Sequence, residues 1–246
     1  MFELSVVGWA WVAASVFAAS VVRGIAGFGF SLIVTVLLTL VLPPSQIVPV
    51  VLLWEISASI GHLPFVHREV DWKALGWLTS GMLLGTPLGV WMLACLPPAP
   101  MCAVINSTVI VFALMLLRGA KPRRSPTKLE TSLIGMSGGI INGASANGGP
   151  PVILFFLSSP AGAAVGRASL IAYFLLTDSW ASVFCWQNGL FTLESWLFMG
   201  AMLPVLALGV ALGSRFFRRL DEAKFKKMVL VLLLAVASAG LAKAVL

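Results

Sequence analysis

Long apolar segments separated by short polar breaks dominate the chain. Eight such segments cover residues 4–42, 46–66, 73–95, 99–117, 131–158, 163–186, 190–213 and 225–245. About 20 apolar residues in a helix cross a hydrocarbon core of roughly 30 Å, so this pattern predicts membrane-spanning helices. A basic stretch interrupted by prolines, 118–128, separates the first four segments from the last four.

Two of these segments are interrupted by runs of small residues. Segment 4–42 contains Arg-Gly-Ile-Ala-Gly-Phe-Gly-Phe at 23–30, and segment 131–158 contains Ile-Asn-Gly-Ala-Ser-Ala-Asn-Gly-Gly-Pro-Pro at 141–151. Each Gly in a helix interior costs about 1 kcal/mol and each Pro about 3 kcal/mol. Irregular backbone within a bilayer is tolerated only where it is buried in protein or lines a cavity. The runs therefore predict two broken helices whose breaks form a binding site.

The second half of the chain repeats the first. The aligned pairs are Arg23-Gly24 with Asn142-Gly143, Gly29 with Gly148, Glu55 with Asp178, and Gly89 with Gly209. Internal duplication of this kind is typical of secondary transporters, whose sites lie at the interface between repeats. We expect one integral membrane domain with repeat 1 over 1–117, a basic cytoplasmic linker over 118–130 and repeat 2 over 131–246.

The basic residues indicate how the interrupted segments lie in the membrane. If each is re-entrant and returns to the side from which it came, all Lys and Arg except Arg23 and Lys243 gather on one side. By the positive-inside rule that side is cytoplasmic, and both termini are periplasmic. The predicted fold is an all-α polytopic membrane protein with two inverted repeats, each a broken, re-entrant helical hairpin followed by three transmembrane helices.

Composition agrees with this class and limits the chemistry. Hydrophobic residues make up 59% and charged residues 10% of the chain, which no soluble domain of this length matches. The basic residues behind the net charge of +7 lie mostly in the short polar stretches between the apolar segments. Membrane topology explains them better than nucleic-acid binding does. Cys95, Cys102 and Cys185 lack metal or redox spacing, and His62 and His67 do not form a zinc motif. We expect no cofactor and no metal, with membrane lipid around the chain.

The two breaks predict a site for a small anion. Unwound backbone exposes N–H groups, and each following half-helix directs the positive end of its dipole at the break. The candidate substrate-binding residues are Arg23, Gly24, Gly27, Gly29, Asn142, Gly143, Ser145, Asn147, Gly148, Gly149 and Pro150. The alternative is that the glycines only permit tight hairpin packing, which leaves Arg23 and the two asparagines unexplained.

Ionisable residues within the predicted spans suggest coupling to protons. Glu55 and Asp178 lie near the middle of 46–66 and 163–186, and His62 shares a helical face with Glu55. Such residues are expensive to hold in a membrane and functional by default. A carboxylate in a low-dielectric site can take up a proton near neutral pH, with His62 as a relay. The alternative is that Glu55 only neutralises Arg23, or that Asp178 only hydrogen-bonds across helices.

The two half-motifs, Gly24-x-x-Gly27-x-Gly29 and Gly143-x-x-x-x-Gly148-Gly149-Pro150, resemble the TauE/SafE family of sulfite and organosulfonate exporters. The resemblance implies a multi-pass permease of the bacterial inner membrane for small sulfur-containing or related organic anions, without a cofactor. The chain has Phe30 where the family commonly has glycine, and Ala144, Ser145 and Ala146 where more glycine is expected. These changes reshape the pocket, so the family's best-known substrates do not transfer directly.

We therefore expect a proton-coupled anion transporter, with export favoured by the resemblance. Two alternatives stay open. A passive anion channel would use the same site without coupling. A membrane-integral enzyme or assembly subunit is disfavoured because the sequence has no nucleophile–base or metal-ligand constellation and little extramembrane surface.

Overall fold

The computed structural model describes residues 4–26, 29–118, 126–157, 162–216 and 222–245, and within these ranges it is helical with no strand. The predicted all-α polytopic class is confirmed. The helices are α1 (Val6–Ala26), α2 (Phe30–Leu38), α3 (Pro44–Val66), the short 3-10 helix η1 (His67–Glu69), α4 (Trp72–Cys95), α5 (Pro98–Leu117), α6 (Lys128–Ser145), α7 (Gly149–Leu157), α8 (Ala163–Gln187), α9 (Leu193–Phe216) and α10 (Glu222–Val245).

Six described helices, α1, α3, α4, α5, α8 and α9, are long and apolar enough to cross a membrane. Large apolar side chains face outward on several of them, including Leu84, Trp91 and Leu208. Polar and charged side chains such as Arg23 and Asp178 are instead buried. This distribution suits a protein whose surroundings are lipid, because a polar group facing hydrocarbon without a partner is costly.

The predicted interruptions separate α1 from α2 and α6 from α7. Gly29 precedes α2 with a φ of 92°, a backbone conformation that glycine adopts without strain. Ala146 follows α6 in the left-handed region with a φ of 55°, which is uncommon for a residue with a side chain. Both helices are therefore interrupted where the small residues predicted.

Both broken pairs are hairpins. Near the start of α1, the indole N–H of Trp11 donates to the carbonyl of Leu37 near the end of α2 (3.0 Å). In the second pair, Gly138 of α6 lies against Val152 of α7. The chain thus turns back along itself in each pair, while the side of the membrane to which it returns stays a prediction.

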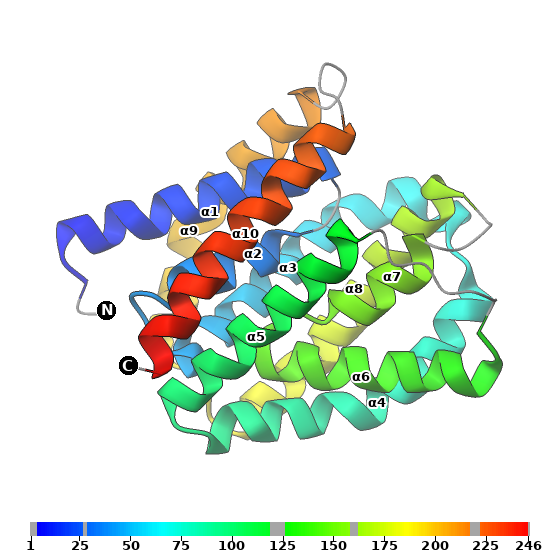
Figure 1. Ribbon diagram of the computed structural model, residues 1–246, viewed down its shortest axis with the longest axis horizontal. Helices are drawn as coiled ribbons and strands as arrows, with labels where there is room; N and C mark the ends of the chain where they lie inside the picture. The colour runs from blue at the N-terminus through cyan, green and yellow to red at the C-terminus, as the bar shows by residue number, and fades with distance from the viewer. Residues whose placement is uncertain (1–3, 27–28, 119–125, 158–161, 217–221, 246) are drawn as a thin grey trace.

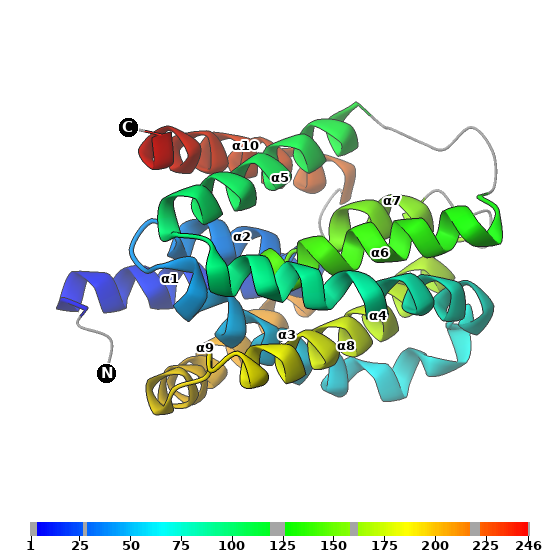
Figure 2. The same cartoon turned by 90° about the horizontal axis from the view of Figure 1, so that it is seen from below.

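The hairpins lie in the middle of the molecule. The pair α5 and α10 covers them on one side, and α3, α8 and α9 lie on the other (Figure 2). The first residues of α1 and the last of α10 lie at the same end of the bundle, whereas α3, α5 and α9 end at the opposite end (Figure 1). The described basic residues at or beside these three helix ends include Arg68, Arg118 and Arg215. Their assignment to the cytoplasm remains a prediction.

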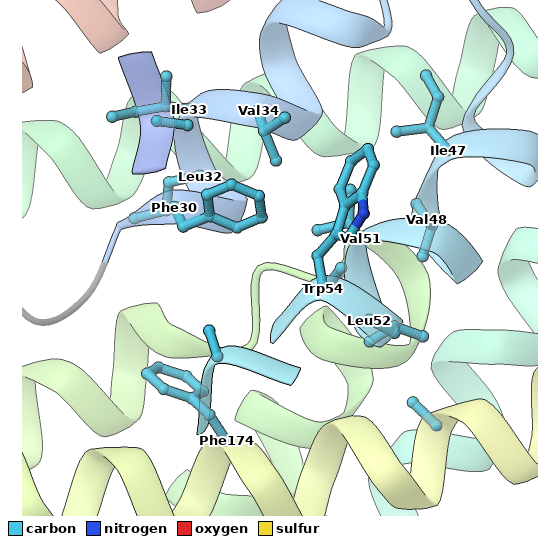
Figure 3. Close-up of a cluster of buried hydrophobic side chains, with 14 of the residues drawn as sticks. Phe30, Leu32, Ile33, Val34, Ile47, Val48, Val51, Leu52, Trp54 and Phe174 are labelled. Atoms are coloured by element: carbon cyan, nitrogen blue, oxygen red, sulfur yellow. The ribbon is translucent and has the colours of Figure 1, made fainter. Parts of the chain in front are cut away.

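An apolar cluster holds α2 against α3 and α9. The rings of Phe30 and Trp54 meet edge to face at 6.1 Å, and Trp54 also packs against Phe198 at 5.7 Å. Figure 3 shows Phe30 and Trp54 among the branched aliphatic side chains of α2 and α3. The indole N–H of Trp54 donates to the carbonyl of Met199 (3.1 Å). Because Trp54 precedes Glu55, this cluster also positions that carboxylate.

Glycines create two close helix contacts that cross between the predicted repeats. Gly81, Gly85 and Gly89 of α4 lie directly on the backbone of α6, where an added Cβ atom would collide with carbonyl oxygens. In the same way, Gly24 of α1 and Gly213 of α9 lie against the backbone of each other's helix. Small residues permit this approach in membranes. We call these contacts the α4–α6 seam and the α1–α9 seam.

Candidate functional site

A buried polar cluster lies where the two breaks approach α3 and α8. Arg23 of α1 is 4% exposed and Glu55 of α3 is 3% exposed, while Asn142 of α6 and Asp178 of α8 are each 1% exposed. All four were predicted as site residues from the sequence. Helix α3 packs against α8, so the two carboxylates meet in the interior although they are far apart in the chain.

The first half of the cluster surrounds Arg23. Its guanidinium forms a salt bridge with Glu55 through Nη1 and donates to Ser59 Oγ through Nη2 (3.2 Å). Glu55 Oε1 accepts a hydrogen bond from the backbone N–H of Ser31 (3.1 Å), in the first turn of α2. One carboxylate therefore bridges a guanidinium and the positive end of a helix dipole.

The second half of the cluster surrounds Asn142. Its Nδ2 donates to Asp178 Oδ1 (2.8 Å) and lies 3.4 Å from Thr177 Oγ1. Its Oδ1 accepts from the backbone N–H of Gly148 (2.9 Å). Asn142 thus connects α8 to the second break with both ends of its amide. Among the described residues, no cationic side chain takes the place here that Arg23 has in the first half.

The two halves interact electrostatically, since the charges of Glu55 and Arg23 both act on Asp178. Among the described residues, the buried charged side chains are Arg23, Glu55 and Asp178, which leaves one negative charge in excess when all three are ionised.

The structure contains both contacts named in the structural alternative to proton coupling. Glu55 pairs with Arg23, and Asp178 accepts a hydrogen bond from another helix.

Several buried polar atoms at the second break have no hydrogen-bond partner within the described part of the chain. They are Asp178 Oδ2 and both side-chain atoms of Asn147, Oδ1 and Nδ2. Asn147 is 1% exposed. Leaving a buried polar group unpaired costs about 1–3 kcal/mol, so such groups call for a specific explanation such as a bound ion.

The other predicted site residues have different surroundings. Gly24 and Gly143 lie in the two glycine seams, and Ser145 Oγ donates to the carbonyl of Ile141 within α6 (2.7 Å). Gly149 lies against Ile153. Gly27 lies outside the described residues, and so does the side chain of His62.

Pro150 lines an apolar pocket of about 360 Å³ between α5, α6 and α7, away from the polar cluster. Three groups of the cluster were not predicted as site residues: the backbone N–H of Ser31 and the hydroxyls of Ser59 and Thr177. Ser31 follows the first break, where free N–H groups were expected, but nothing in the pattern distinguished its amide from its neighbours. Thr177 carries no sequence signal of its own.

Comparison with known proteins adds the family. Residues 12–239 match the family described as "Sulfite exporter TauE/SafE". The chain belongs to this family. The TauE/SafE resemblance carried by the two glycine motifs is thereby confirmed.

Two relatives of the TauE/SafE chain have descriptive names. The chain is 26% identical over 201 residues to a "Probable sulfite/organosulfonate exporter TauE" of Cupriavidus necator, an alignment that covers 78% of this chain and 77% of the relative. It is 26% identical over 191 residues to a "Probable inner membrane transporter protein TsaS" of Comamonas testosteroni, covering 75% and 78%. No solved structure matches the chain. With the apolar spans, these matches identify a multi-pass membrane transporter.

Proposed function

We propose that this transporter exports small sulfur-containing or related organic anions, such as sulfite or an organosulfonate, across the bacterial inner membrane with proton coupling. The names of the two relatives support this substrate class. The observation that carries the proposal is the buried guanidinium of Arg23 at the first break, held beside the start of α2.

The contacts of Glu55 suggest how an oxyanion would bind. A guanidinium presents parallel N–H groups that match the oxygens of a carboxylate or a sulfonate. In this structure the carboxylate of Glu55 engages Arg23 and the amide of Ser31. A substrate oxyanion would take over these contacts, and Glu55 would then need a proton to remain buried without its partner.

The other predicted residues would surround the anion held by Arg23 and the start of α2. Gly29 and the start of α2 would face the anion, and Asn142 and Asn147 would line the opposite side, near Gly148. Gly24, Gly143, Ser145, Gly149 and Pro150 would shape the site through packing. Asp178, Glu55 and His62 would carry the coupling protons.

The test is the thermal stability of the purified protein with sulfite, thiosulfate, sulfoacetate, taurine, acetate, chloride and phosphate. A ligand at about 100 times its dissociation constant adds roughly 2.7 kcal/mol. We expect one sulfur oxyanion to stabilise the wild type and to lose this effect in Arg23→Gln. The matched control is Arg68→Gln, which removes an exposed arginine from η1. Absence of any response to sulfur oxyanions would refute the proposed substrate class.

Flux measurements on reconstituted vesicles distinguish coupled transport from a passive channel. A coupled transporter accumulates the anion when a pH gradient is imposed, whereas a channel follows the anion gradient and the membrane potential alone. Anion flux that is indifferent to the pH gradient would contradict proton coupling and favour the channel.

A further inference from the structure

We infer that the second break binds a monovalent cation, a proton or a sodium ion, at Asp178 and Asn147, while the anion binds at the first break. This division rests on the proposed function and assigns the two breaks different ligands. It differs from the arrangement above, in which both breaks line the anion site, and it assigns Asn147 to the cation rather than to the anion.

The second break is poorly supplied with donors for an anion. Helix α7 begins Gly149-Pro150-Pro151, so two of its first three residues lack a backbone N–H. The amide of Gly148 is already bonded to Asn142. Helix α2 begins Phe30-Ser31-Leu32, and each of these residues has a backbone N–H at the positive end of the helix. The donors for an anion are therefore concentrated at the first break.

The second break is instead rich in oxygen acceptors. Helix α6 ends there, and the last carbonyl groups of a helix carry the negative end of its dipole. Asp178 Oδ2 and Asn147 Oδ1 are buried and have no partner among the residues described. Asn142 bonds both to Asp178 and to the residue that follows Asn147, which brings the two acceptors to the same break.

The oxygen chemistry selects the kind of ion. Hard cations such as sodium prefer carboxylate, amide and backbone oxygens, and half-helix ends with unwound carbonyls coordinate sodium ions or protons in secondary transporters. No group of three or more His, Cys, Asp or Glu residues in the described ranges could hold a metal. A transition-metal site is therefore not the explanation for the free oxygens.

The charge balance points to a single positive charge. Among the described residues, the titratable groups that interact electrostatically with Asp178 are Glu55 of α3, Arg23 of α1 and Tyr173 of α8. Helices α4, α6 and α7 contribute no charged side chain beyond their first turns. Because Arg23 is engaged by Glu55, the carboxylate of Asp178 has no cation of its own. One bound proton or sodium ion neutralises it.

The test measures the thermal midpoint of the purified protein without substrate anion. Sodium, potassium and choline chlorides are compared at matched concentration, and each series is repeated from acid to neutral pH. At 100 times the dissociation constant, a bound ion should raise the midpoint by roughly 5–10 °C. A higher thermal midpoint in sodium chloride than in potassium or choline chloride identifies sodium as the bound ion. A response to pH that is the same in all three salts identifies the proton.

The variants separate this site from the anion site. We expect Asp178→Asn to abolish the cation response and to keep the stabilisation by a sulfur oxyanion, which also reports that the variant folds. Asn147→Ala should weaken the sodium response, while Asn106→Ala should not, although Asn106 also has a buried unpartnered amide oxygen.

A wild-type response that survives in Asp178→Asn would overturn the inference, and so would a wild type indifferent to both sodium and pH. If the wild type responds to the cation but to no sulfur oxyanion, the proposed function is refuted while the cation site is supported.

Discussion

The ion pair between Arg23 and Glu55 allows the binding role of Arg23 to be separated from its role in folding. Removing one partner of a buried pair leaves an uncompensated charge and typically costs about 3–5 kcal/mol. In Arg23→Gln, Glu55 keeps the hydrogen bond from the amide of Ser31. We therefore expect the free energy of unfolding of Arg23→Gln to fall by about 3 kcal/mol, near the lower end of this range, and its thermal midpoint to fall by roughly 10 °C.

Replacing both charges should restore most of this stability. In the double variant Arg23→Gln with Glu55→Gln, no charge is buried without a partner and the two amides can hydrogen-bond to each other. We expect a net cost of about 1 kcal/mol, so removing the second charge should recover about 2 kcal/mol of the stability lost in Arg23→Gln.

The assay measures thermal unfolding and oxyanion binding for four proteins: the wild type, Arg23→Gln, Glu55→Gln and the double variant. The double variant should be folded and yet unable to bind the sulfur oxyanion, which would assign Arg23 to the substrate. If the double variant is as unstable as Arg23→Gln alone, the energetic reasoning about the pair is wrong. If it is stable and binds the oxyanion like the wild type, Arg23 does not contact the substrate.

Two further predictions concern the scaffold. Gly85→Ala should lower the free energy of unfolding by about 1–3 kcal/mol, because its Cβ atom would collide with a carbonyl of α6. The control Gly76→Ala, in the same helix with open space around it, should be neutral or stabilising by up to about 1 kcal/mol. Equal midpoints for the two variants would contradict the α4–α6 seam. Trp54→Phe should cost about 1 kcal/mol through the lost hydrogen bond to Met199, and Trp91→Phe, at an exposed position, should cost less than half of that. A Trp54→Phe protein as stable as the wild type would show that the bond contributes nothing.

The elements that could be predicted from the sequence have local signals. Helix-breaking residues within apolar segments predicted both breaks, and the observed starts of α3, α4 and α5 lie within two residues of the predicted segments. Glu55 and Asp178 were recognised because a carboxylate within an apolar span is conspicuous. Each of these signals depends on the residue and its near neighbours in the chain.

The contacts that were not predicted depend on long-range packing. The glycines at 81, 85 and 89 form one small-residue face of α4, but their spacing alone does not identify α6 as the partner, since any helix surface of small residues would fit. Likewise, the sequence suggested Asn142 as a substrate-binding residue but did not reveal that its amide connects Asp178 to Gly148. That contact depends on the position of α8, which has no local signal in the sequence.

The two seams and the polar cluster together define which parts of the site are fixed and which are replaceable. The α1–α9 seam holds the first break, and the α4–α6 seam holds the second, through contacts between backbones that leave no space for adjustment. The breaks are connected to α3 and α8, in contrast, by side chains: Arg23 to Glu55, and Asn142 to Asp178. A ligand can compete for a side-chain contact but not for a glycine seam. Substrate and coupling ion would therefore act on the position of α3 and α8 relative to the breaks, which is where the two carboxylates lie.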